Sequence, residues 1–423
     1  MTKSTLILLL AFVSSTVFAQ YKANDLHVVS QDIGKPFTYK HLQLFPIYAN
    51  NSFQEANQHL GTYVSLQKAI ENKQVSISEI EVSSTEQVYD LFSNSMIVSQ
   101  ELTSYEENLS AINPEKSHRV ESEEEGADDV FSIFDDRLLH PDARMNVNAV
   151  ATKLFITNHS QDTIFLMAGE VLKGGRQDRV IAQDMIVPPN SDKVHLPVFC
   201  AEKDRWYYRS KSSKDFDQYF AVSSLRVRKA VSEQNDQLAV WNAIEDLQVT
   251  NNIDSKTKAY TDLKASMNFN TELEDYVAYF TESFEGKMSA TKGQNNQNEK
   301  MVGVIVATGG NIVGCDIFAT HDLFVQQYEG LIHSYATDAI TYGQKMENNA
   351  MSFVVDMDEI KLNQYLEETL KLSEISDDCE AKEDILNTSN PINQEVMAET
   401  LDDKKVAADL LNSRQKVHFS SFE

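Results

Sequence analysis

Cysteine is scarce in this chain, with Cys200, Cys315 and Cys379 the only three among 423 residues. So few thiols exclude a scaffold held by many disulfides, and they permit at most one disulfide with one thiol left over. No two cysteines form a CxxC pair, and the ten histidines lack a metal-ligand spacing such as HExxH. The EF-hand and phosphate-loop patterns are also missing. We therefore expect no metal site and no cofactor.

Long apolar runs are missing after the first residues, and none approaches the ~20 residues that a membrane-spanning helix needs. The N-terminus has Lys3, an apolar run over Thr5–Val13 and a small-residue ending at Ala19. This order is typical of a secretory signal peptide. It predicts a peptide over residues 1–19, cleaved near Ala19 and Gln20, and export to the periplasm or the extracellular space. The alternative is a buried N-terminal helix.

Positive charge is also in deficit, because 37 basic residues face 64 acidic ones and the net charge is −27. Such an acidic surface repels nucleic acid and anionic lipid, so neither is an expected partner. Many of the acidic residues fall within about 101–144, a segment that we interpret as a solvated insertion. The oligomeric state is not predicted by these features.

Periodicity divides the chain into two halves of different character. Residues 20–210 are rich in alternating or β-branched runs, which predict strands. The expected strands are Leu42–Tyr48, Val75–Val82, Val150–Thr157, Thr163–Ala168, Arg179–Val187 and Lys193–Phe199. Residues 211–345 carry helical spacing and a hairpin over 302–318, and we expect them to complete the same domain.

The remaining residues, 346–423, read as an acidic C-terminal extension in which Val417–Phe422 adds an edge strand. No repeat of solenoid or propeller period is present. The predicted fold class is therefore α+β. It combines a β-rich antiparallel sheet or sandwich in the N-terminal half with a helical C-terminal half that contains a β-hairpin.

Chemistry-bearing residues gather between Ala168 and Trp206, where a diglycine is followed at once by Arg-Gln-Asp-Arg. Adjacent glycines let backbone N–H groups approach a ligand, and arginines bind carboxylates or phosphates through paired hydrogen bonds. We predict Glu170 and Glu202 as the acid or base. The predicted ligand-binding residues are Gly174, Gly175, Arg176, Gln177, Asp178, Arg179, Arg205 and Trp206.

Other polar residues favour structural roles. Cys200 lies near Arg205, but His195 is five residues away on a predicted strand and therefore faces the opposite side. A buried or disulfide-linked Cys200 is favoured over a nucleophile. A later cluster, which we interpret as helix caps and interhelical hydrogen bonds rather than chemistry, consists of Asp316, His321, Asp322, His333 and Asp338.

Four segments together resemble one uncharacterised family, the ARG and Rhodanese-Phosphatase-superfamily-associated Protein domain, in which ARG stands for ADP-ribosylglycohydrolase. The order covers about Leu42 to Tyr342, with Phe199 and Asp204 departing from the family pattern. The four segments are GEVLKGGRQDR (Gly169–Arg179), PVFCAEKDRW (Pro197–Trp206), VGCDIFATHDLF (Val313–Phe324) and HSYATDAI (His333–Ile340). The resemblance implies an association with ADP-ribose-handling proteins and no particular activity.

Two functions follow as hypotheses. In the first, an exported protein binds a small anionic or sugar-containing ligand, such as ADP-ribose or a nucleotide, in a pocket lined by arginine and glutamate. If it is an enzyme, a metal-independent hydrolase is expected. In the alternative, the protein is a non-catalytic structural or interaction module of the cell envelope, and the polar motif is an internal salt-bridge network.

Overall fold

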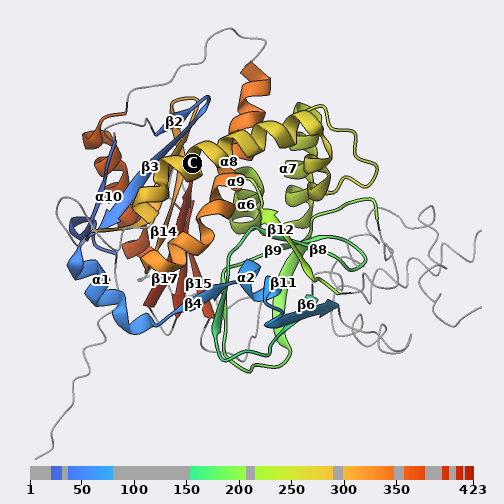
Figure 1. The fold of residues 1–423 in the computed structure, drawn as a ribbon, viewed down its shortest axis with the longest axis horizontal. Helices are drawn as coiled ribbons and strands as arrows, with labels where there is room; N and C mark the ends of the chain where they lie inside the picture. Colours follow the sequence, from blue (N-terminus) through green and yellow to red (C-terminus); the bar gives the residue numbers. More distant parts are fainter. Residues whose placement is uncertain are drawn as a thin grey trace, which may run out of the picture.

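The computed structural model describes residues 21–30, 37–79, 153–205, 215–288, 299–346, 357–376, 393–399, 406–412 and 415–423. The predicted signal peptide over 1–19, the acidic segment over 101–144, Trp206 and Cys379 lie outside the described residues. Within the described residues, antiparallel sheets dominate the first half and long helices the second, which confirms the α+β class (Figure 1).

The largest sheet combines strands from the beginning, middle and end of the chain. Its core is the hairpin predicted over 302–318, in which Gly309 and Gly310 join two antiparallel strands. A two-residue strand, β2 (Thr38–Tyr39), pairs beside it with β3. In spatial order the other strands are β1 (Leu26–Val28), β3 (Leu42–Ala49), β13 (Lys300–Thr308), β14 (Asn311–Phe318), β17 (Gln415–Phe422), β16 (Val406–Asn412) and β15 (Asn393–Glu399).

Two smaller sheets carry the polar motif and lie beside the large sheet (Figure 1). Their described pairings are antiparallel except for β4 with β7. One sheet has the order β10 (Met185–Val187), β7 (Thr163–Leu166) and β4 (Tyr63–Ser65). The other has the order β12 (Gln218–Val222), β8 (Glu170–Lys173), β9 (Arg179–Ile181), β11 (Val194–Cys200), β6 (Lys153–Asn158) and β5 (Val75–Glu79).

The helices cover these sheets, and α9 (His321–Met346) is the longest of those described. Thr320 begins it, because its side-chain hydroxyl accepts a hydrogen bond from the backbone N–H of Leu323 at 3.3 Å. None of the described helices is both long enough and apolar enough to span a membrane. The others are α1 (Asn51–Asn57), α2 (Leu66–Glu71), α6 (Leu225–Lys229), α7 (Gln237–Thr250), α8 (Met267–Met288) and α10 (Glu359–Ser376), with short helical turns η1 (Ala23–Asp25), η2 (Gln58–Leu60), η4 (Ala230–Gln234) and η5 (Tyr260–Ala265).

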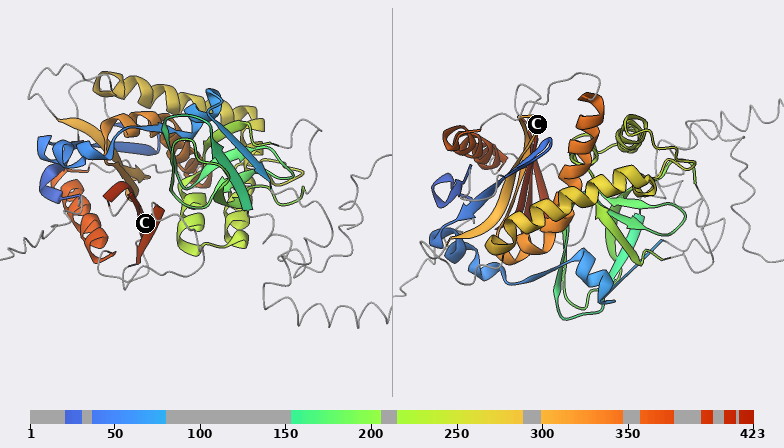
Figure 2. Two further views of the ribbon diagram at one scale, coloured as in Figure 1. Left: turned by 90° about the horizontal axis from the view of Figure 1, so that it is seen from below. Right: turned by 45° about the horizontal axis from the view of Figure 1, so that its top comes forward.

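Helices α9 and α10 cover opposite faces of the large sheet (Figure 2). The neighbouring residues Cys315 and Asp316 of β14 point to opposite sides of a strand. Asp316 accepts a hydrogen bond from Tyr335 of α9, whereas Cys315 interacts with Tyr365 of α10. The sheet is therefore buried on both faces, and strand β14 is placed to carry polar groups into the interior.

Three sequence expectations differ from the structure. The run predicted as one strand over Arg179–Val187 is divided into β9 and β10, which belong to different sheets, because Asp184 between them turns its carboxylate inward. The segment Tyr63–Ile70, whose residue pattern suggests one short helix, begins with strand β4 before α2. Finally, β17 is no edge strand, since it lies between β14 and β16 and brings the last residues of the chain into the large sheet.

Candidate functional site

The diglycine lies in the turn that joins β8 to β9, where close packing leaves no room for a side chain. Gly175 has a φ of +54°, and a Cβ at this position would lie 2.4 Å from the Phe216 ring and 2.7 Å from a carboxylate oxygen of Glu79. A Cβ on Gly174 would lie 2.3 Å from the carbonyl oxygen of Asp215. Glycine is therefore needed here for contact with the protein's own chain.

Asp178 is the centre of a buried polar network behind this turn. Its carboxylate is fully buried and accepts hydrogen bonds from the Gly174 N–H at 3.3 Å and the Thr261 hydroxyl at 2.7 Å. The guanidinium of Arg205 reaches the same carboxylate at 3.4 Å. Arg205 also donates from Nε to both oxygens of Glu202 at 2.9 Å, and from Nη2 to Oε2 at 2.7 Å.

The two arginines of the motif share one carboxylate from a distant strand. Arg176 and Arg179 each lie 3.3 Å from an oxygen of Glu79, at the end of β5. Arg179 is buried, whereas the side chain of Arg176 is 26% exposed. Although a strand would have placed these arginines on opposite sides, the turn brings both to Glu79.

The structure therefore brings Arg176, Asp178, Arg179, Glu202 and Arg205 together as partners of one another or of Glu79, whereas Glu170 lies outside this cluster. Gln177 joins the same cluster, because its amide donates to the backbone carbonyl of Glu202 at 2.8 Å. Burying charges costs free energy that a partner of good geometry offsets, so each arginine here depends on its carboxylate. Cys200 lies beside the cluster, and burial raises the pKa of its thiol above the usual value.

A second buried network joins the small sheets to the large one. Arg228 of α6 donates to both oxygens of Asp316, at 3.0 and 2.6 Å, and Tyr335 donates to the same carboxylate at 2.5 Å. His418 of β17 lies between Asp316, at 3.1 Å from Nε2, and Asp184, which contacts its Nδ1.

The charged groups of this second network shift one another's pKa values. Burial alone raises the pKa of Asp316, but the Arg228 guanidinium and His418 hold it well below the usual value. Burial lowers the pKa of His418, whereas Asp184 and Asp316 raise it to about 9. His418 is therefore protonated at pH 7, between two carboxylates.

Glu170 interacts both with Asp184 of the second network and with Tyr219. It is fully buried, and its Oε2 accepts a hydrogen bond from the Met167 N–H at 2.8 Å. Burial raises its pKa to about 8, so the carboxyl group is protonated at pH 7. The Tyr219 hydroxyl and the Gln327 amide lower the pKa of Glu170 and so partly offset the effect of burial. Among the described residues, Oε1 of Glu170 has no hydrogen bond of normal geometry.

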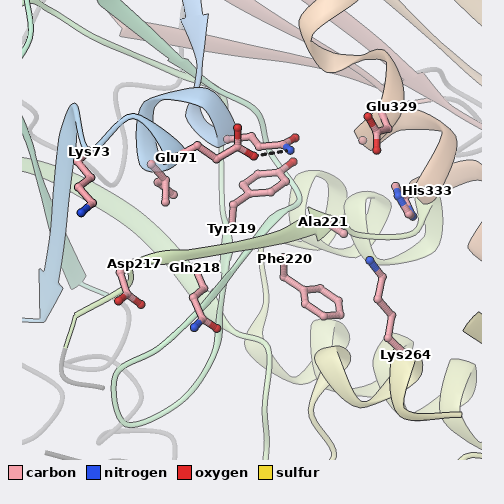
Figure 3. A pocket seen from close by; sticks show the side chains of 13 residues that line it. Glu71, Lys73, Asp217, Gln218, Tyr219, Phe220, Ala221, Lys264, Glu329 and His333 are labelled. Carbon is pink, nitrogen blue, oxygen red and sulfur yellow. Dashed lines mark hydrogen bonds between the residues drawn. The ribbon is translucent and has the colours of Figure 1, made fainter. Parts of the chain in front are cut away.

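Tyr219 connects Glu170 to a surface groove of about 570 Å³. The groove lies between α2, β12, η5 and α9 (Figure 3). Burial raises the pKa of the Tyr219 hydroxyl, and the carboxylates of Glu170, Glu329 and Glu71 act in the same sense. The groove is lined by Gln67, Ile70, Glu71, Lys73, Asp217, Gln218, Tyr219, Phe220, Ala221, Lys264, Glu329, Gly330 and His333.

None of the predicted ligand-binding residues that the structure describes lines this groove, and Tyr219 and Lys264 were not among the predicted site residues. The sequence analysis also missed Glu79 and Asp184 as network members. Asp184 did carry a signal, because it interrupts an otherwise apolar run, and a buried charge among apolar residues usually has a partner. Among the described residues, no group of three or more His, Cys, Asp or Glu side chains is placed to hold a metal ion.

The fold and these networks define an α+β protein with two buried polar networks, one behind the turn between β8 and β9 and one that joins the small sheets to the large one. The chain belongs to the ARG and Rhodanese-Phosphatase-superfamily-associated Protein domain family, whose model matches residues 145–422. This match confirms the family resemblance of the four motif segments. Comparison with curated proteins and with solved structures gave no match.

Proposed function

We propose that this protein binds a small sugar-containing or anionic ligand in the groove beside Tyr219. The observation that carries the proposal is the position of Glu170, a motif residue that is fully buried and interacts with the hydroxyl of Tyr219, a residue of the groove wall. The family motif thereby reaches a cavity of a size common for small-molecule sites.

The chemistry of the walls supports this ligand class. Lys73 and Lys264 offer positive charge to an anionic group, and Glu71, Glu329 and Gln218 offer acceptors and donors to hydroxyl groups. Phe220 adds an aromatic ring against which the apolar face of a sugar packs.

If the bound molecule is hydrolysed, Glu170 is a better proton donor than Glu202. A carboxyl with a pKa of about 8 carries a proton at pH 7 and can deliver it to the groove through the Tyr219 hydroxyl. Glu202, by contrast, is held by Arg205 and accepts a hydrogen bond from the Asp178 N–H.

A thermal-shift screen tests the proposal, with ADP-ribose, nucleotides, sugar phosphates and organic acids as probes. A ligand present at 100 times its Kd adds about 2.7 kcal/mol of stability. We expect at least one probe to raise the Tm of the wild type and to lose most of that effect in Tyr219→Phe. The control is Tyr39→Phe, which removes a hydroxyl outside the groove. No shift with any probe, or equal shifts in both variants, argues against the proposal.

The interaction-module hypothesis keeps support from a separate observation, the mutual pairing of Arg176, Arg179 and Arg205 with Glu79, Glu202 and Asp178. In this hypothesis the motif stabilises the two small sheets, and the protein acts through its surface in the cell envelope. This hypothesis is favoured if no probe shifts the Tm and if loss of Arg205 strongly destabilises the protein.

Export is part of both hypotheses and has its own test. Expression of the full chain in a bacterial host, followed by fractionation and mass measurement, is expected to give periplasmic or secreted protein that begins at Gln20. Intact protein beginning at Met1 in the cytoplasm contradicts the signal peptide.

A further inference from the structure

Lys264 differs from Lys40, Lys203 and Lys258, which have carboxylate partners. Lys203 and Lys258 both lie close to Glu245, and Lys40 lies 2.8 Å from Glu272. Within the described part of the chain, no carboxylate lies within salt-bridge distance of Lys264. Its ammonium nitrogen instead lies 4.9 Å from the centre of the Phe220 ring, inside the groove.

His333 faces Lys264 across the groove. Figure 3 shows the Lys264 side chain rising from η5 toward the His333 ring on α9. Burial and the neighbouring Lys264 charge lower the pKa of His333 to about 4, so its imidazole is neutral at pH 7. Within the described residues, its Nδ1 is buried and has no hydrogen-bond partner.

The surroundings also make the Lys264 ammonium group lose its proton more readily than a solvated lysine does. Burial lowers the pKa of its ammonium group, although Glu274 and Glu329 act in the opposite sense. A lysine beside an aromatic ring and a neutral histidine, with no ion pair, has the arrangement of a nucleophilic amine.

We propose that Lys264 forms a reversible imine with the aldehyde group of a sugar phosphate bound in the groove. The inference rests on the proposed function, since it names the covalent chemistry of the same site. Lys73, at the opposite end of the groove in Figure 3, is the other lysine of its lining.

Imine formation needs only the Lys264 amine and the sugar aldehyde, and it releases water. The Lys264 nitrogen attacks the carbonyl carbon, a C–N bond forms, and the carbonyl π electrons move to oxygen. The two hydrogens of the amine then pass to that oxygen, with His333 as the relay. The C–O bond breaks, water leaves, and a C=N bond remains.

Trapping with cyanoborohydride and ribose 5-phosphate tests the inference, because the open-chain form of this sugar carries the aldehyde. Cyanoborohydride donates hydride to the imine carbon and leaves a stable secondary amine, which peptide mass spectrometry locates. At pH 7 we expect at least tenfold more label on Lys264 than on Lys73 or Lys258. Label spread evenly over the surface lysines overturns the inference.

Two variants and one matched probe separate covalent chemistry from binding. Lys264→Arg retains the charge and is expected to lose the label, whereas Lys258→Arg is expected to label like the wild type. His333→Gln is expected to slow labelling of Lys264 at least threefold. Unchanged labelling rates in His333→Gln overturn the relay and with it the inference.

Ribitol 5-phosphate has no aldehyde and reports binding alone. If it raises the Tm and competes with ribose 5-phosphate while no label reaches Lys264, the imine is excluded and the proposed function stands. If Lys264 is labelled but ribitol 5-phosphate gives no shift and no competition, the imine stands and the binding proposal fails.

Discussion

Arg228 and Asp316 form a two-bond ion pair in the interior, with Nη1–Oδ2 and Nη2–Oδ1 distances of 3.0 and 2.6 Å and both side chains 1% exposed. The pair joins helix α6 to strand β14 and therefore holds this helix against the large sheet. Tyr335 and His418 complete the hydrogen bonds of the same carboxylate.

Asp316→Asn is expected to lower the free energy of unfolding by about 3–5 kcal/mol, because it removes the ion-pair partner of the buried Arg228. Urea unfolding followed by circular dichroism measures the loss. Glu367→Gln is the control, since Glu367 pairs with Lys371 on the surface and such pairs contribute less than about 1 kcal/mol. Equal effects of the two substitutions contradict the assigned role of Arg228.

Arg205→Met and Arg176→Met separate the buried from the partly exposed arginine of the motif region. Arg205 is 2% exposed and binds both Glu202 and Asp178, so its loss is expected to cost about 3–5 kcal/mol. Arg176 is 26% exposed, and Glu79 retains Arg179, so its loss is expected to cost about 1 kcal/mol or less. Chemical denaturation of both variants measures the difference. A stable Arg205→Met protein rules out a structural network around Asp178.

Glu170→Gln is expected to change how stability depends on pH. The pKa of Glu170 rises from 4.5 to about 8 in the folded protein, chiefly by burial. The folded state therefore binds the proton more tightly, and this contribution to stability is full below about pH 4.5 and lost as the pH rises through 8. The glutamine variant cannot titrate, so its stability relative to the wild type is expected to increase between pH 4.5 and 8. Urea midpoints across pH 4–9 measure the effect, and parallel curves exclude the raised pKa.

Gly169→Ala tests the packing of the motif glycine against Arg228. Gly169 has a φ of +90°, and a Cβ would lie 2.4 Å from Cγ of Arg228. Gly61 has a φ of +78° and nothing within 4 Å of the added atom, so Gly61→Ala isolates the backbone strain of about 1–3 kcal/mol. We expect Gly169→Ala to cost about 1–3 kcal/mol more than Gly61→Ala, because Arg228 must also shift. Thermal unfolding compares the two, and equal losses argue against a close contact.

Local patterns predicted most of the elements correctly. The hairpin over 302–318 has alternating apolar strands around Gly309 and Gly310, and residues 211–345 carry apolar positions at helical spacing. Both signals depend on residues close in sequence, so they are present before the chain folds. The run over Arg179–Val187 was misjudged because Asp184 is satisfied by His418, a partner 234 residues away.

The amino-acid sequence by itself determined the α+β class, the family and the concentration of charge between Glu170 and Arg205. Tertiary structure decided what those charges do. Arg179 meets Glu79 across 100 residues of chain, and Tyr219 brings Glu170 to a groove whose other walls come from α2, η5 and α9. Such partners follow from the packing of sheets and helices, since a buried charge is stabilised by whichever opposite charge the fold places beside it.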